Sequence, residues 1–140
     1  MRFTFKQALG FSIRFIPQVK GKLKNALTVF VFHDVTDHPS EFTKEYGISV
    51  SVKTFSRQIN WIKDNFTIIH PSDIIKSTIL PKNAAIISFD DGFLGTFDNG
   101  LRVLNELGLP AIIFLNMHAI QEQKPIISAV ACYLSKYSSE

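Results

Sequence analysis

The chain has 140 residues, of which 46% are hydrophobic and 19% are charged, and its formal net charge is +3. This composition excludes an intrinsically disordered chain and predicts one folded domain with an apolar core. The single cysteine, Cys132, excludes an internal disulfide, and we interpret it as a small buried residue of a helix.

The first 25 residues predict a separate basic segment. Six of the fifteen Lys and Arg residues lie there, whereas the first acidic residue is Asp34. Apolar residues, many of them Phe, alternate with these charges over residues 4–18, a pattern typical of a basic amphipathic helix. Such a helix could lie on a membrane surface through residues 1–24 or pack against the domain, because both need the same apolar face.

Other roles for this segment are disfavoured by its sequence. Its apolar runs are too short to span a membrane, and Arg14 interrupts the apolar region that a signal peptide would need. No nucleic-acid recognition motif accompanies the charge. We therefore expect a bacterial protein that is cytoplasmic or peripheral to the membrane, with no nucleic-acid partner.

Residues 26–140 predict one domain of alternating strands and helices. The strands are expected at Ala26–Phe32, Thr67–Ile69, Ala84–Phe89 and from Pro110 to Leu115, and the helices at Thr54–Phe66, Ser72–Lys76, Thr96–Leu107 and Ser128–Tyr137. Phe55, Ile59 and Ile62 share one face of their helix, and Gly108 stands where a left-handed helix cap is expected. The alternation is typical of an α/β fold with a parallel sheet or open barrel. A complete barrel needs roughly 250 residues, so we expect about its first half.

The strand at Ala84–Phe89 is followed directly by two carboxylates and a glycine, Asp90, Asp91 and Gly92. In parallel α/β folds, ligands bind at the carboxyl ends of the strands, which is where these two acids are expected. Neighbouring side chains on extended backbone point to opposite sides, so Asp90 and Asp91 should have different tasks.

Four segments in the same order resemble the polysaccharide deacetylase family, which includes chitin, peptidoglycan and poly-N-acetylglucosamine deacetylases. The Ser88–Gly92 segment resembles the family's T/S-F-D-D-G signature, and Val29–Val35 resembles its opening strand. Ile48–Ser51 and the helix after it resemble the segment that follows the opening strand in the family. Leu104–Asn116 resembles the helix, turn and strand that follow the signature. The resemblance covers about Leu27 to Ile120.

This resemblance implies a metal-dependent hydrolase that removes N-acetyl or related acyl groups from a polysaccharide of the cell envelope. It assigns Asp90 as the general base and Asp91 as a ligand of a divalent metal, zinc or a similar ion. A bound cation would polarise the amide carbonyl and acidify a water molecule.

The chain departs from the family pattern in its histidines. The family's His-Ser/Thr-x-x-His metal motif, expected after the strand that ends near Leu115, is absent, as is the later His that supplies the catalytic acid. We therefore expect weak metal binding and weak or no activity from this chain alone, with the rest of the site in a missing C-terminal half, or self-association of the uncovered sheet. The alternative is a non-catalytic sugar-binding or membrane-associated remnant of such a domain.

The remaining candidates follow strands that should end at the same edge. His33 and His118 could contact substrate, support the site or be structural, and Asn116 could form a hydrogen bond with a sugar hydroxyl. Asp34 is interpreted as a loop acid, and His38 and His70 as solvated loop residues beside prolines.

Overall fold

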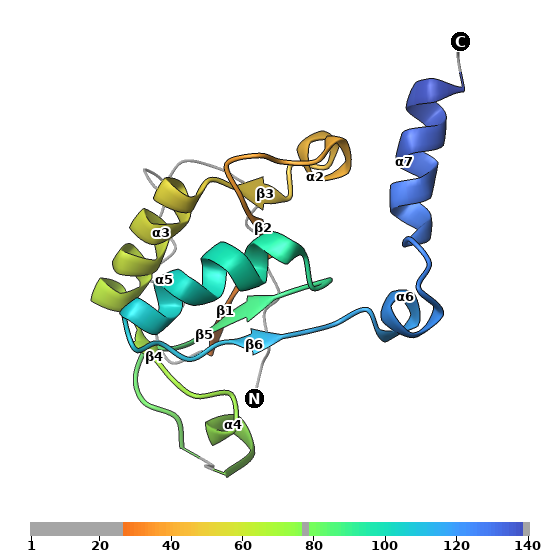
Figure 1. Ribbon diagram of the computed structural model, residues 1–140. Helices are drawn as coiled ribbons and strands as arrows, with labels where there is room; N and C mark the ends of the chain where they lie inside the picture. Colours follow the sequence, from red (N-terminus) through yellow and green to blue (C-terminus); the bar gives the residue numbers. More distant parts are fainter. Residues whose placement is uncertain (1–26, 77–78, 139–140) are drawn as a thin grey trace.

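The computed structural model describes residues 27–76 and 79–138, and within them a parallel sheet is backed by helices (Figure 1). The sheet has four strands, β1 (Thr28–Phe32), β4 (Thr67–Ile68), β5 (Ala84–Phe89) and β6 (Ile112–Ile113), and every pairing is parallel. β5 lies in the middle: β1 pairs with it along Ala85–Phe89, β4 pairs with its first two residues, and β6 with its last two. The predicted parallel α/β class is therefore confirmed, and the described strands form an open sheet.

Beyond the end of β1, the chain forms a second, smaller parallel ladder. β2 (Asp34–Val35) pairs with β3 (Ser49–Val50), and the short helix α2 (Glu41–Glu45) lies between them in the chain. Ser40 caps α2 by accepting a hydrogen bond from the Thr43 backbone N–H. Neither the two strands nor α2 was predicted from the sequence, because elements of two to five residues are too short to show a periodic pattern.

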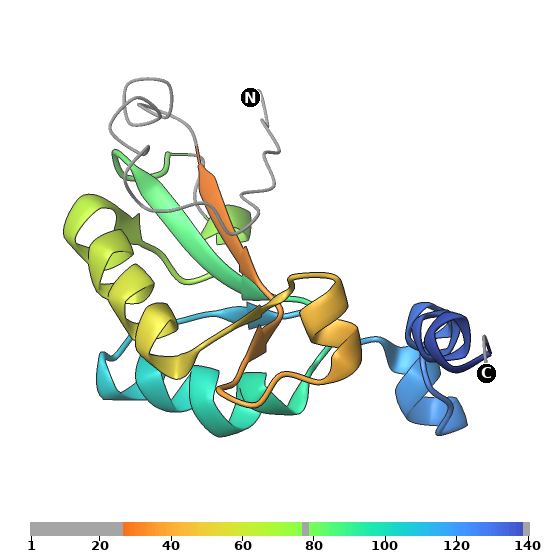
Figure 2. The same ribbon diagram turned by 90° about the horizontal axis from the view of Figure 1, so that it is seen from above.

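Two helices cover one face of the sheet, as Figure 2 shows from above. α3 (Val52–Asn65) begins after Ser51, whose hydroxyl accepts from the Thr54 backbone N–H. Its buried residues are Phe55, Ile59 and Ile62, which confirms the predicted face. They form one apolar core with residues of β2, β5 and the helix α5 (Leu101–Glu106), namely Val35, Ile87, Phe89, Val103 and Leu104.

The helix predicted over Thr96–Leu107 is divided into two parts. A π-helical turn, η2 (Thr96–Gly100), precedes the regular helix α5 (Leu101–Glu106). Gly108 has φ +64°, its N–H donates to the Asn105 carbonyl, and the Leu109 N–H donates to the Leu104 carbonyl. These two bonds form the left-handed cap that was predicted for Gly108.

β5 is buried on its other face as well. Ile69, Ala84 and Ile86 form a second apolar cluster there, joined by Leu27, Leu80 and Ile112. All six residues of β5 are buried, as expected for a central parallel strand. The short helix α4 (Asp73–Lys76) follows β4 and contributes no buried residue.

Two further helices, α6 (Met117–Glu122) and α7 (Ile127–Tyr137), lie beyond β6 and stand apart from the sheet in Figures 1 and 2. α7 confirms a predicted helix and buries only Cys132, whereas α6 was not predicted. None of the helices in residues 27–76 and 79–138 is long and apolar enough to cross a membrane. The basic helix predicted in residues 1–25 lies outside the described residues.

Candidate functional site

Asp90 and Asp91 stand where the central strand β5 ends. The Asp90 backbone N–H donates to the Phe32 carbonyl at 3.0 Å, so the ladder between β1 and β5 extends to Asp90. The chain then turns sharply, because Asp91 has φ +68° and Gly92 has φ +73°. A Cβ at Gly92 would lie 2.7 Å from Leu115 Cδ2, so the turn is also closed in by the segment after β6.

Left-handed backbone is costly for a residue that carries a Cβ, and such residues persist where surrounding structure holds them. In Asp91 this conformation falls on one of the two carboxylates singled out from the sequence. Asp90 is half-buried and Asp91 is exposed, so the two acids have different surroundings. That difference is compatible with a division of tasks between them.

His33 occupies the corresponding position after β1. Because Phe32 pairs with Phe89, His33 and Asp90 are the next residues along the two paired strands. The His33 carbonyl accepts a hydrogen bond from Thr96 Oγ1 at 2.6 Å, which fixes the backbone of the site to η2. The structure thus brings His33, Asp90 and Asp91 to one edge of the sheet, as the parallel-strand argument predicted.

Asn116 and His118 follow β6 but belong to α6. Asn116 is the N-cap of this helix, and its Oδ1 accepts from the Ala119 N–H at 3.3 Å. His118 is exposed in the first turn. Their proposed roles in substrate binding stay predictions.

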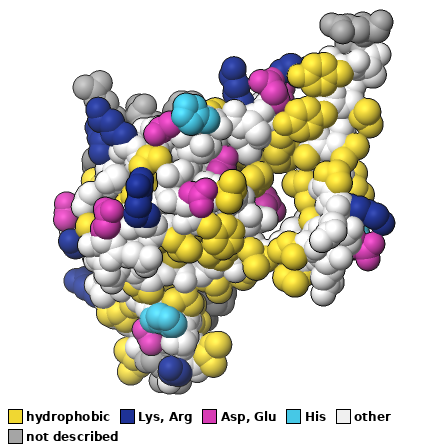
Figure 3. All heavy atoms as spheres, in the orientation of Figure 1, with side chains coloured by type: hydrophobic (Ala, Val, Ile, Leu, Met, Phe, Trp, Pro, Cys, Tyr) yellow, Lys and Arg dark blue, Asp and Glu magenta, His cyan; other side chains and the backbone are white. Residues whose placement is uncertain are grey.

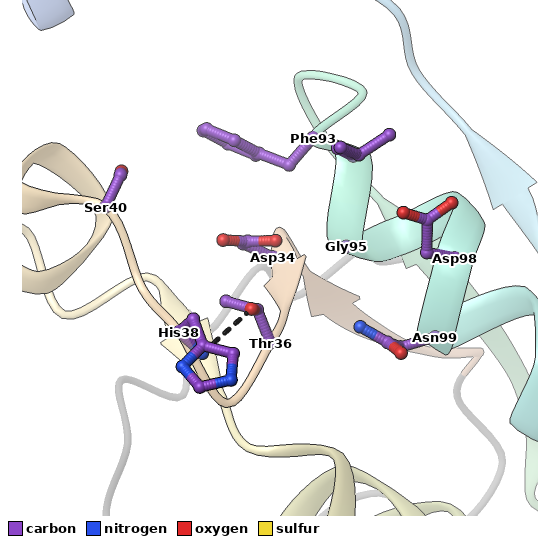
Figure 4. Close-up of a pocket in the computed structure, with 9 residues that line it drawn as sticks. Asp34, Thr36, His38, Ser40, Phe93, Gly95, Asp98 and Asn99 are labelled. Carbon is purple, nitrogen blue, oxygen red and sulfur yellow. Dashed lines mark hydrogen bonds between the residues drawn. The ribbon is translucent and has the colours of Figure 1, made fainter.

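A cavity of about 290 Å³ lies beside this edge, between the chain after β1 and the chain after Gly92. Its lining comes from two segments, Asp34, Thr36, His38 and Ser40 on one side, and Phe93, Leu94, Gly95, Asp98 and Asn99 on the other. Figure 4 shows Asp34 between these two sides. Sequence reasoning missed this cavity, because its two sides are distant in the chain.

The interpretation of Asp34 as a loop acid was wrong. Asp34 lies in β2 and is only 7% exposed. Burial raises the pKa of its carboxyl above the ordinary value, and a hydrogen bond from the Gly95 backbone N–H opposes this rise. His38 is exposed, as predicted, although it also lines the cavity.

A catalytic zinc site needs about three protein ligands. Within the described ranges, no group of three or more His, Cys, Asp or Glu side chains is placed to hold a metal ion. The carboxylates at the end of β5 therefore do not fit a complete metal centre by themselves, and no metal-dependent step follows from the described residues.

No family model matches the sequence, and no curated protein matches it. Solved structures do resemble it. IcaB from Ammonifex degensii has a TM-score of 0.55 at 20% identity, over 64% of this chain and 37% of that chain. A de-N-acetylase from Aggregatibacter actinomycetemcomitans has a TM-score of 0.52 at 26% identity, over 62% of this chain and 36% of that chain. The Streptococcus pyogenes deacetylase PplD has a TM-score of 0.53 at 17% identity, over 64% and 41%.

Two of these structures are by name a de-N-acetylase and a deacetylase, so the resemblance inferred from the motifs is confirmed. The likeness to IcaB and PplD is one of fold, since their sequence identities are low. The chain spans between about a third and two fifths of the length of these relatives.

Proposed function

We propose that this chain carries the two active-site carboxylates, Asp90 and Asp91, of a hydrolase that removes N-acetyl groups from a polysaccharide. The observation that carries the proposal is the left-handed Asp90–Asp91–Gly92 turn, which ends the central parallel strand of a deacetylase-like sheet. Support also comes from the solved relative with 26% identity, which is itself a de-N-acetylase.

Asp90 is the residue that we assign to proton transfer. An amide is a poor electrophile and water is a poor nucleophile, so hydrolysis needs a base that takes the proton of the attacking water. Asp90 is half-buried at the end of the ladder, and its backbone is held by the hydrogen bond to Phe32. A base fixed in this way loses little freedom when the substrate binds.

Asp91 is the residue that we assign to a divalent cation, zinc or a similar ion. An exposed carboxylate on the turn after β5 can serve as one ligand of such an ion. The described residues supply no group of three ligands, so the proposal requires the others to come from elsewhere. His33, beside Asp90 in the ladder register, is assigned to substrate contact or to support of the two acids.

A second function, non-catalytic sugar binding by the same edge, is favoured by the lack of a three-ligand group in the described part of the chain. It retains the fold and the N-acetylated polysaccharide as partner, and it requires no proton transfer. The two functions differ in whether acetate is released.

The test measures acetate released from an N-acetylated glucosamine oligomer, with zinc added, by this chain together with the segment that supplies the other metal ligands, and by three variants of the same assembly. We expect Asp90→Asn to lower the rate by about 10² to 10⁴, the usual contribution of a positioned general base. Asp91→Asn should also lower the rate, and added zinc should not restore it, because an amide is a weaker ligand than a carboxylate. The matched control, Asp64→Asn, removes an exposed acid of α3 and should leave the rate unchanged.

Acetate release that is equal in the wild type and in Asp90→Asn would refute the hydrolase proposal for this site. Oligomer binding without acetate release would establish the sugar-binding alternative instead.

A further inference from the structure

The cavity between residues 34–40 and 93–99 is separate from the two acids at the end of β5, since neither Asp90 nor Asp91 lines it. Pockets for small molecules usually begin at about 300 Å³. With about 290 Å³, this cavity suits a ligand of the size of one sugar ring rather than an oligomer.

The lining of the cavity is acidic. Asp34 and Asp98 both face it, and no Lys or Arg is among the nine residues that line it. Asp34 is only 7% exposed, so its charge is poorly solvated by water. A buried carboxylate with no Lys or Arg among the described residues that line its cavity favours a positively charged ligand, because an opposite charge would offset the cost of its burial.

The carboxylate of Asp34 is held in place and points into the cavity. In Figure 4 one carboxylate oxygen of Asp34 lies toward Gly95, and the carboxylate accepts a hydrogen bond from the Gly95 backbone N–H. The other oxygen lies toward the open space between Ser40 and Phe93. A Cβ at Gly95 would lie 2.3 Å from Asp34 Oδ1 and 2.6 Å from the Val35 carbonyl oxygen. Only a residue without a side chain allows η2 to approach Asp34 this closely.

The π-helical turn supplies the other polar groups. Asn99 Nδ2 donates to the Val35 carbonyl at 2.8 Å, which fixes the side chain and leaves its Oδ1 as an acceptor. Asp98 lies one residue earlier on the same turn and is exposed to solvent. The ring of Phe93 stands across the cavity from Ser40 in Figure 4 and offers an apolar, electron-rich face.

A metal ion is a poor occupant of this cavity. Among the described residues, no three His, Cys, Asp or Glu side chains are placed to hold a metal ion, and this includes Asp34, Asp98 and His38 of the cavity. An ammonium group is less demanding in the type of its partners, because neutral hydroxyl, amide or carbonyl oxygens accept from the N–H donors that the carboxylate leaves free.

We propose that this cavity binds one amino-sugar residue with a free, protonated amine, the amine on Asp34 and the sugar ring between Phe93 and the Asp98–Asn99 turn. The preference for an ammonium group rests on the lining alone. The choice of a sugar as its carrier rests on the proposed function, because deacetylation of an N-acetylated glycan creates such an amine. The cavity would then hold a sugar that has already been deacetylated, next to the acids at the end of β5.

The test is a titration of the whole, ¹⁵N-labelled chain with glucosamine, N-acetylglucosamine and glucose, followed by backbone amide shifts. We expect glucosamine to shift residues 34–40 and 93–99 with an affinity about tenfold or more above the two neutral sugars, since a charged hydrogen bond is lost with them. Equal affinity for the three sugars, or shifts only outside these segments, would overturn the proposal.

Variants locate the amine within the cavity. Asp34→Asn should weaken glucosamine binding about tenfold or more, whereas Asp64→Asn, which removes an exposed acid outside the cavity, should not change it. Asp98→Asn provides a second variant on an exposed turn that can be made without disturbing the core, and it should weaken binding by a smaller factor. Unchanged binding in both cavity variants would refute the site.

A third readout is independent of any variant. The ammonium group should lower the pKa of the Asp34 carboxyl, because an opposite charge favours the ionised form. The ¹³Cγ titration of Asp34 with and without glucosamine measures this, with Asp98 and His38 as the other titratable groups that line the cavity. Glucosamine binding is measured without acetate release, so the two proposals can fail separately. Glucosamine binding by the chain, with no acetate released once the other metal ligands are supplied, would contradict only the hydrolase. Acetate release without glucosamine binding would contradict only this site.

Discussion

The backbone at Gly95 lies so close to the Asp34 carboxylate that no residue with a side chain would fit at position 95. The backbone of Gly95 is not left-handed, so the requirement for glycine is purely steric. We predict that Gly95→Ala destabilises the protein by about 1–3 kcal/mol, the usual cost of forcing a methyl group into a packed site. Urea denaturation of the wild type and the variant measures this difference.

Gly47 is the matched control for this substitution. It has φ +61° and nothing within 4 Å of an added Cβ, so its requirement is conformational rather than steric. Asn tolerates left-handed backbone, and Gly47→Asn should change the stability by less than about 0.5 kcal/mol. If Gly95→Ala is as mild as Gly47→Asn, the packing described around Asp34 is wrong.

Asp34 also predicts a pH dependence of stability. Burial raises the pKa of Asp34 in the folded protein above its ordinary value in the unfolded chain, so between these two pKa values the folded state binds more protons than the unfolded state. Stability contributed by this group is therefore greatest below the unfolded pKa and is lost as the pH rises through the folded pKa. Asp34→Asn removes the cost of ionising a buried group, since its Oδ1 can still accept from Gly95.

We expect the stability of Asp34→Asn relative to the wild type to increase as the pH rises through that window and then to level off toward neutral pH. Urea denaturation of both proteins at a series of pH values measures the difference. A difference that stays constant over the series would contradict the assignment of a raised pKa to Asp34. A stabilising Asp34→Asn would also agree with a functional role, because binding groups are often kept at a cost in stability.

The secondary-structure elements differ in how far the sequence predicts them. α3 carries three apolar residues at helical spacing and β5 is a continuous apolar run, so their local pattern agrees with their final burial. β2 and β3 have two residues each, and their pairing depends on contacts across the fold rather than on any local pattern. The π-helical turn was likewise hidden, because its residues continue the pattern of a regular helix up to Gly108.

The same distinction applies to the two sites. His33, Asp90 and Asp91 were predicted to meet because each follows a parallel strand, and parallel strands end at one edge. The cavity at Asp34 depends on η2 approaching β2, and the only local sign of that approach is a glycine at position 95. A single glycine does not reveal which residue it approaches.

Helices α6 and α7 pack much more weakly against the rest of the protein than the sheet strands pack against one another and against α3 and α5. Figure 3 shows hydrophobic side chains along α7 and, across a hollow, on the facing surface of the body. α7 buries only Cys132, while Ile127 and Leu134 are 87% and 62% exposed. Its link to α2 includes the exposed ion pair between Lys136 and Glu41, a type of interaction that contributes about 0–1 kcal/mol.

This difference predicts two levels of stability within one chain. Amides of β5, buried on both faces and paired on both edges, should exchange with solvent only through global unfolding. Amides of α7 should exchange through local opening, at a free energy well below the global value, because little apolar surface is exposed anew when the helix opens. Native-state hydrogen exchange by NMR in low urea separates the two, since only global unfolding depends steeply on urea. Lys136→Ala should speed exchange in α7 slightly and leave β5 unchanged. Exchange of α7 and β5 at the same free energy would instead show that α7 unfolds together with the sheet as one unit.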